Sequence, residues 1–135
     1  MKRTVLIVDD DPKFLTFLSR TLKRAGFQTL TASDGCEVGD LLLSTPVDVL
    51  VLDLQMPGMN GWEVLRALRR REIGVQVLAS GQPRPKVIVV SGRGEDETVS
   101  FAQRLGADAY LTKPFWRDQI LATVREVLGS EQAGA

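Results

Sequence analysis

Residues 4–12 read Thr-Val-Leu-Ile-Val-Asp-Asp-Asp-Pro and contain the first structural pattern of the chain. Thr4–Val8 is a short run of branched apolar residues, which is typical of a strand buried on both faces of a parallel sheet. Three aspartates follow at its carboxyl end, and Pro12 then begins an amphipathic stretch. The pattern predicts a buried strand, an acidic turn and a helix.

The same alternation continues along most of the chain. Strands are expected over Thr4–Val8, Phe27–Ala32, Val47–Leu52, Lys86–Val90 and Ala109–Leu111. Helices are expected over Pro12–Ala25, Cys36–Ser44, Gly61–Arg71, Glu95–Leu105 and Trp116–Leu128. Strands that alternate with helices pair in parallel through right-handed crossovers. The sequence therefore predicts an α/β protein built on a five-stranded parallel sheet.

A chain of 135 residues is long enough for one domain with one sheet. We expect this domain to cover residues 1–130, with a flexible tail at residues 131–135. The irregular stretch Glu72–Pro85, which separates the third helix from the fourth strand, is expected to be a surface insertion. It contains a second strand-like run that ends in Ser80 and Gly81.

Composition excludes several classes of function. The 17 basic and 17 acidic residues balance, which argues against direct nucleic-acid binding through a basic surface. The chain has no histidine, so it contains neither a histidine-ligated metal site nor a Ser-His-Asp triad. Its single cysteine, Cys36, cannot form an internal disulfide, and no apolar run is long enough to cross a membrane. These features favour a cytoplasmic protein.

Polar residues follow the expected strands where each strand ends. Asp9, Asp10, Asp53, Ser91 and Lys113 all occupy such positions. Because the carboxyl ends of parallel strands share one edge of the sheet, we expect these side chains to converge. Crowded carboxylates with only oxygen donors suit Mg²⁺ better than zinc. With an ammonium and a hydroxyl beside them, they could hold a phosphoryl group, or one carboxylate could attack phosphorus.

The chain resembles the receiver (phosphoacceptor) domain of two-component response regulators. The matching stretches are residues 8–12, 53–61, 89–92, 106–110 and 111–115, which read Val-Asp-Asp-Asp-Pro, Asp-Leu-Gln-Met-Pro-Gly-Met-Asn-Gly, Val-Val-Ser-Gly, Gly-Ala-Asp-Ala-Tyr and Leu-Thr-Lys-Pro-Phe. The resemblance runs from about residue 4 to residue 128. It implies a flavodoxin-like, doubly wound (βα)5 fold in three layers with strand order 2-1-3-4-5.

The resemblance also implies a role for each acidic residue. Asp53 resembles the phosphoacceptor, which takes a phosphoryl group from a phosphohistidine of a partner. Asp10 and Asp53 resemble direct ligands of Mg²⁺, or alternatively Mn²⁺, and the backbone carbonyl of Gln55 resembles a third ligand. Asp9 resembles the neighbouring acid that acts on the metal through water.

Three further residues resemble the switching machinery of the family. Lys113 resembles the lysine that pairs with Asp53, and the resemblance implies a cis bond between Lys113 and Pro114. Ser91 resembles the switch hydroxyl, and its strand is more continuously apolar than the run that ends at Ser80. Tyr110 resembles the aromatic residue that turns inward. The surface that switches in the family corresponds to residues 95–128.

The implied partners are a sensor histidine kinase or a histidine phosphotransfer protein, and a downstream protein or a second copy of the chain. The implied chemistry is limited to the domain's own phosphorylation and dephosphorylation, so the chain is not expected to be a conventional enzyme. One alternative is a pseudo-receiver that binds its partner without phosphorylation. Another is a Mg²⁺-dependent aspartyl phosphohydrolase, which would need an acid where Gln55 stands.

Simpler interpretations suit the remaining residues. Asp11 precedes Pro12 and is expected to cap the first helix. The three arginines at positions 69–71 are expected to form a solvated helix end. Cys36 is expected to be a small buried or turn residue. Trp116 stands where the family more often has a small polar cap, and an exposed tryptophan there would suit partner binding.

Overall fold

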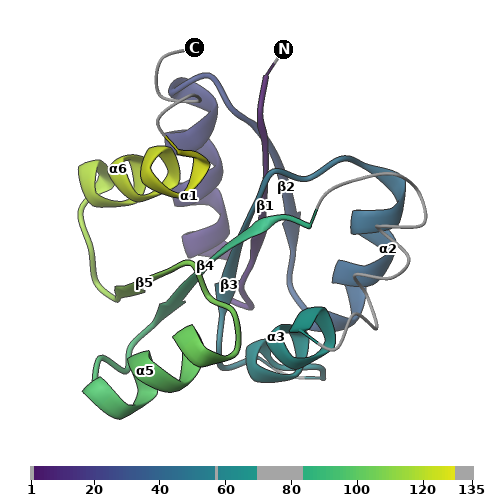
Figure 1. The fold of residues 1–135 in the computed structure, drawn as a ribbon. Coiled ribbons are helices and arrows are strands. Elements are labelled where there is room, and N and C mark those ends of the chain that lie inside the picture. The colour runs from purple at the N-terminus through teal and green to yellow at the C-terminus, as the bar shows by residue number, and fades with distance from the viewer. Residues whose placement is uncertain (1, 57, 70–83, 130–135) are drawn as a thin grey trace.

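The computed structural model describes residues 2–56, 58–69 and 84–129 (Figure 1). Its strands are β1 (Thr4–Val8), β2 (Gln28–Ala32), β3 (Val49–Asp53), β4 (Lys86–Ser91) and β5 (Ala109–Thr112). Its helices are α1 (Pro12–Arg24), the 3-10 turn η1 (Gly35–Glu37), α2 (Val38–Ser44), α3 (Gly61–Arg69), α5 (Asp96–Arg104) and α6 (Arg117–Leu128). The strands form one sheet in the order β2-β1-β3-β4-β5, and all four pairings are parallel. The predicted strand order is confirmed.

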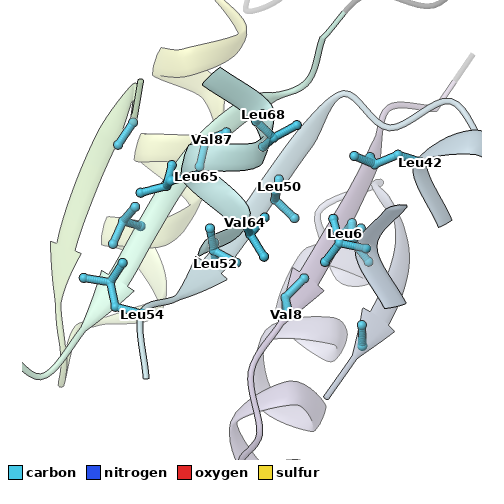
Figure 2. Packing of buried hydrophobic residues seen from close by; sticks show 14 of the residues in the cluster. Leu6, Val8, Leu42, Leu50, Leu52, Leu54, Val64, Leu65, Leu68 and Val87 are labelled. Atoms are coloured by element: carbon cyan, nitrogen blue, oxygen red, sulfur yellow. The ribbon is translucent and has the colours of Figure 1, made fainter. Parts of the chain in front are cut away.

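The sheet divides the core into two layers because successive side chains of each strand point to opposite faces. In β1, Val5 and Ile7 pack under α1 and α6, whereas Leu6 and Val8 pack on the other side. Figure 2 shows that second layer, where Leu50 and Leu52 of β3 lie against α3. The central strands β1 and β3 are buried along their whole length, so an apolar residue is needed at nearly every position.

The parallel register brings the strand ends to one edge of the sheet. Val8 pairs with Leu52, so Asp9 and Asp53 leave neighbouring strands at the same level. Asp53 pairs with Val90, and Ser91 pairs with Thr112. The residues that follow β1, β3, β4 and β5 therefore meet above a sheet whose central strands are buried and mostly apolar.

Helix boundaries differ from the sequence-based predictions by a few residues. Asp11 caps α1 as predicted, since its carboxylate accepts the backbone N–H of Lys13 at 3.0 Å. The prediction that Trp116 begins the last helix is wrong: its backbone is extended, and it is the cap residue before Arg117. Gln119 holds this cap because its side-chain oxygen accepts the N–H of Trp116 at 2.6 Å.

Two predictions fall on residues that the structure does not describe. Most of the predicted insertion, together with the Ser80 alternative, lies at residues 70–83, and the predicted tail lies at residues 131–135. Among the described helices, none is both long enough and apolar enough to cross a membrane.

Candidate functional site

Three carboxylates meet at the carboxyl edge of the sheet. One carboxylate oxygen from each of Asp9, Asp10 and Asp53 lies within 4.8 Å of the other two. Asp9 and Asp10 follow β1, and Asp53 is the last residue of the neighbouring strand β3. Asp9 and Asp53 are buried, whereas Asp10 is exposed to solvent. The three carboxylates therefore converge as the sequence predicts, and the cluster is open to solvent at Asp10.

Lys113 brings an ammonium into this acidic cluster from β5. Its Nζ lies 2.6 Å from Asp9 Oδ2 and 4.0 Å from Asp53 Oδ1. The resemblance implied a pair with Asp53, but Asp9 is the closer partner here. Asp9 is only 1% exposed and also accepts the backbone N–H of Asp11 at 2.9 Å, so the lysine compensates a deeply buried charge.

The backbone around Lys113 is fixed to the neighbouring strand. Its N–H donates to the carbonyl of Ser91 at 2.7 Å, which continues the pairing of β4 with β5. The Lys113–Pro114 peptide bond is cis, as the resemblance implied.

An aromatic ring, which the sequence interpretation did not identify, supports the Lys113 ammonium. The ring centroid of Phe14 lies 4.1 Å from Nζ, within the range of a cation–π interaction. Phe115 packs edge-on against the same ring with centroids 5.7 Å apart. Phe14 comes from the first turn of α1 and Phe115 from the loop after β5, so a ring from one segment contacts the lysine and a ring from a distant segment packs against that ring.

The Asp53 carboxyl has a pKa raised to about 6. Burial is the largest cause because it penalises the charged form, and the neighbouring Asp9 carboxylate adds to the effect. Lys113 acts in the opposite direction, as does the backbone N–H of Gln55, which donates to Asp53 Oδ1 at 3.4 Å. Keeping Asp53 ionised in the folded protein therefore costs free energy, and a bound cation would reduce that cost.

The β3–α3 loop after Asp53 is held by a turn that follows β2. Asp34 Oδ1 accepts the N–H of Met59 at 3.3 Å and the N–H of Cys36 at 2.8 Å. These bonds, chiefly the one from Cys36, lower the pKa of Asp34. The N–H of Gly35 donates in turn to the carbonyl of Met59 at 3.0 Å. Nothing local in the sequence indicates this contact, because Asp34 and Met59 are 25 residues apart.

Gly61 allows α3 to begin directly against β3. A Cβ at this position would lie 2.1 Å from the carbonyl oxygen of Asp53, which no side chain tolerates. Its N–H donates to the carbonyl of Leu54 at 3.2 Å. Glycine at position 61 is therefore part of what places the Asp53 backbone.

Ser91 and Tyr110 are joined through one residue. The Ser91 hydroxyl is buried at the end of β4 and accepts the N–H of Arg93 at 3.1 Å. The Tyr110 hydroxyl donates to the carbonyl of Arg93, and its ring packs against the core under α3 and α5. If the Ser91–Arg93 turn moved, the Arg93 carbonyl that accepts from the Tyr110 hydroxyl would therefore move with it.

The donor set fits a hard divalent cation. The three side chains of the cluster all offer carboxylate oxygens, and Asp10 provides one on the solvent side, where bound water can complete the coordination. Lys113 already occupies one oxygen of Asp9, which agrees with an indirect role for Asp9. Gln55 follows in the exposed loop, and its carbonyl ligand role stays a prediction.

Other residues singled out in the sequence lie away from this cluster. The Trp116 side chain is 81% exposed on the loop before α6. Cys36 is exposed in the turn η1, so the buried alternative is wrong. Arg69 ends α3 and donates to the carbonyl of Arg104 at 2.6 Å, whereas Arg70 and Arg71 lie outside the described residues.

Curated relatives of this chain are transcriptional regulators. The chain is 37% identical over 131 residues to the transcriptional regulatory protein KdpE of Mycobacterium tuberculosis, which covers 97% of this chain and 53% of that protein. It is 30% identical over 135 residues to the alkaline phosphatase synthesis transcriptional regulatory protein PhoP of Bacillus subtilis, covering all of this chain and 52% of that protein. The chain thus spans about half the length of these relatives.

Solved structures and a family model match the same part of this chain. The receiver domain of Francisella response regulator 1452 superposes with a TM-score of 0.82 at 31% identity, covering 94% of this chain and 97% of that one. The chemotaxis protein CheY4 of Vibrio cholerae gives 0.81 at 28% identity, covering 94% and 99%. The model of the response regulator receiver domain matches residues 5–125. With its fold and acidic cluster in place, the chain belongs to the receiver domain family of two-component response regulators.

Proposed function

We propose that this receiver domain accepts a phosphoryl group on Asp53 in a Mg²⁺-dependent reaction. The observation that carries the proposal is the convergence of Asp9, Asp10 and Asp53 within 4.8 Å, with the Lys113 ammonium in contact with the cluster. The arrangement supplies a nucleophilic oxygen, a site for a cation and a second positive charge in one place.

In the proposed step, a carboxylate oxygen of Asp53 attacks the phosphorus of a phosphohistidine on a partner protein. The new P–O bond forms as the P–N bond breaks, and the imidazole leaves with the electron pair of that bond. Lys113 lies 4.0 Å from Asp53 Oδ1, close enough to pair with a phosphoryl oxygen there. The Ser91 hydroxyl, one strand away, would donate to another.

Mg²⁺ bound by Asp10 and Asp53, with the Gln55 carbonyl and water completing its shell, would neutralise charge on the phosphoryl oxygens. Asp9 would act on it through water while holding Lys113. Burial, with the Asp9 carboxylate adding to it, raises the pKa of Asp53 to about 6 in the absence of a cation, which is consistent with a site built to bind one.

The proposed output is a change at the surface formed by α5, β5 and α6. Ser91 would move toward the phosphoryl group, and Tyr110 would follow because Arg93 bonds to both. The donor would be a sensor histidine kinase or a histidine phosphotransfer protein in the cytoplasm. A downstream protein or a second copy of the chain would bind the altered surface.

Intact mass spectrometry with acetyl phosphate and Mg²⁺ tests the proposal. The wild-type protein is expected to gain the mass of one phosphoryl group, and both chelation of Mg²⁺ and the substitution Asp53→Asn are expected to abolish the gain. Asp11→Asn is the matched control, since Asp11 is an aspartate near the site that serves as a helix cap.

Two results would overturn the assignment in different ways. Uptake of phosphate by Asp53→Asn at another acid would show that the phosphoacceptor is misidentified. No uptake by a folded wild-type protein, together with unchanged calorimetric heats on addition of Mg²⁺, would favour the pseudo-receiver. Steady release of phosphate from small phosphate esters would instead indicate the phosphohydrolase.

A further inference from the structure

The loop between β3 and α3 carries Gln55, whose carbonyl is the third ligand of Mg²⁺ in the proposed function. Local bonds fix the end of this loop that leads into α3. The Asn60 side chain accepts the N–H of Glu63 at 3.0 Å, and the N–H of Asn60 donates to the Glu63 carboxylate at 3.1 Å. Gln55 is exposed, and its N–H makes only a long bond of 3.4 Å to Asp53. The part of the loop that follows Asp53 is therefore weakly held by its own side chains.

The turn that follows β2 lies against this loop because β2 and β3 end at the same level. Ala32 of β2 and Leu52 of β3 both pair with Val8 of β1, which lies between the two strands. The turn leads into α2 and the loop leads into α3, and both helices pack on the same face of the sheet (Figure 1). The two segments therefore meet on that face, at the end of the sheet where the acidic cluster lies.

The turn holds Met59 of the loop by both of its backbone groups. Asp34 Oδ1 accepts the N–H of Met59 at 3.3 Å, and the N–H of Gly35 donates to the Met59 carbonyl at 3.0 Å. The same Asp34 oxygen accepts the N–H of Cys36 at 2.8 Å, so the carboxylate is itself fixed within the turn. A Cβ at Gly35 would lie 2.1 Å from the Met59 carbonyl oxygen, and one at Gly58 would lie 2.3 Å from Asp34 Oδ2. The turn and the loop are thus in direct contact on both sides.

We propose that Asp34 is a positioning residue for the Mg²⁺ site. It acts through the Met59 backbone, which fixes the loop segment that carries the Gln55 carbonyl. A loop that is already ordered loses less conformational freedom when one of its carbonyls binds a cation, so Asp34 raises the affinity for Mg²⁺ without touching it. The inference rests on the proposed function, since it requires a cation that Asp10, Asp53 and the Gln55 carbonyl share.

Such a coupling is reciprocal by thermodynamic necessity. If the bond from Met59 to Asp34 favours Mg²⁺ binding, then bound Mg²⁺ stabilises that bond by the same factor. Hydrogen exchange of the Met59 N–H reports how often the bond opens. A contact that only stabilised the fold would give the same exchange rate with and without the metal.

Calorimetric titration with Mg²⁺, far below the unfolding temperature, compares the wild type with two variants. Asp34→Ala removes the acceptor and is expected to raise the Kd for Mg²⁺ about fivefold to tenfold. Asp34→Asn keeps an oxygen that accepts the N–H groups of Cys36 and Met59, so its Kd is expected to stay within about twofold of the wild type. Phosphoryl uptake by Asp34→Ala from acetyl phosphate should be slow at low Mg²⁺ and close to that of the wild type at saturating Mg²⁺.

Asp40→Ala is the matched control, since Asp40 is an exposed carboxylate on α2. This variant removes the same charge without altering the contact with Met59, and its Kd for Mg²⁺ is expected to equal that of the wild type. In the wild type, NMR should show that saturating Mg²⁺ slows exchange of the Met59 N–H by about the factor that Asp34→Ala costs in affinity.

Equal Mg²⁺ affinities of Asp34→Ala and Asp40→Ala would overturn the inference and leave the proposed function intact. If Asp34→Ala does not fold, Met59 exchange in the wild type decides, and a rate that Mg²⁺ does not change would overturn the inference. A wild-type protein that binds no Mg²⁺ would instead overturn the proposed function, and this inference with it.

Discussion

At the scale of single residues, the Asp53 carboxyl links the chemistry of the site to the stability of the protein. Its pKa is about 6 in the fold and 3.8 as an isolated group. The folded protein therefore binds this proton more tightly than the unfolded chain, and its stability falls as pH rises from about 4 to 6. We expect Asp53→Asn to raise the free energy of unfolding in EDTA at pH 7.5 by about 1–2 kcal/mol.

Urea denaturation at two pH values checks this prediction. Below about pH 3 the carboxyl is protonated in both states, so the advantage of Asp53→Asn should disappear there. A variant that is less stable than the wild type at pH 7.5 without metal would contradict the electrostatic interpretation of the site.

Phe14 is the residue whose role is least visible in the sequence. Its ring lies 4.1 Å from the Lys113 ammonium, so we infer that it positions the lysine between Asp9 and Asp53. Phe14→Leu removes the ring face but keeps an apolar side chain. It is expected to slow phosphoryl uptake roughly threefold to tenfold, which corresponds to the energy of a partly buried cation–π contact.

Phe14→Tyr retains the ring and serves as the conservative control, with a rate close to that of the wild type. Because neither variant alters a metal ligand, calorimetry should give equal Mg²⁺ affinities for all three proteins. Equal uptake rates for the leucine and tyrosine variants would show that Phe14 only fills space.

At the scale of elements, two glycines in helices differ in the space that is available for a side chain. A Cβ at Gly61 would lie 2.1 Å from the Asp53 carbonyl oxygen, whereas a Cβ at Gly39 of α2 would meet nothing within 4 Å. Gly61→Ala is therefore expected to destabilise the protein by about 1–3 kcal/mol and to reduce phosphoryl uptake, because the start of α3 must move away from β3. Gly39→Ala is expected to stabilise it by about 0.5–1 kcal/mol.

Denaturant titration of both variants compares these values directly, and the uptake assay follows the site. If Gly61→Ala were as stable and as active as Gly39→Ala, the close approach of α3 to β3 would be disproved.

The elements themselves were largely predictable. Buried parallel strands must be apolar on both faces, so β1 and β3 stand out in the sequence as runs of valine, leucine and isoleucine. Helix starts were less certain. Trp116 fits the apolar periodicity of α6, yet it has an extended backbone, because the Gln119 side chain satisfies its N–H in place of a helical turn.

At the scale of the whole molecule, topology explains which site residues could be foreseen. Asp9, Asp10, Asp53 and Lys113 were identified because parallel strands end at one edge of the sheet. The contacts of Phe14 with Lys113 and of Asp34 with Met59 depend on how a helix is rotated and how two loops meet. No local pattern encodes those contacts.

The ion pair between Asp9 and Lys113 joins residues that are 104 positions apart. During synthesis, the ribosome therefore releases the three aspartates long before it adds the lysine that balances them. A growing chain that has completed only β1 to β4 carries the acids without their ammonium and without its edge strand. The acidic cluster therefore gains its ammonium only when the edge strand β5 has joined the sheet, so completion of the site depends on completion of the fold.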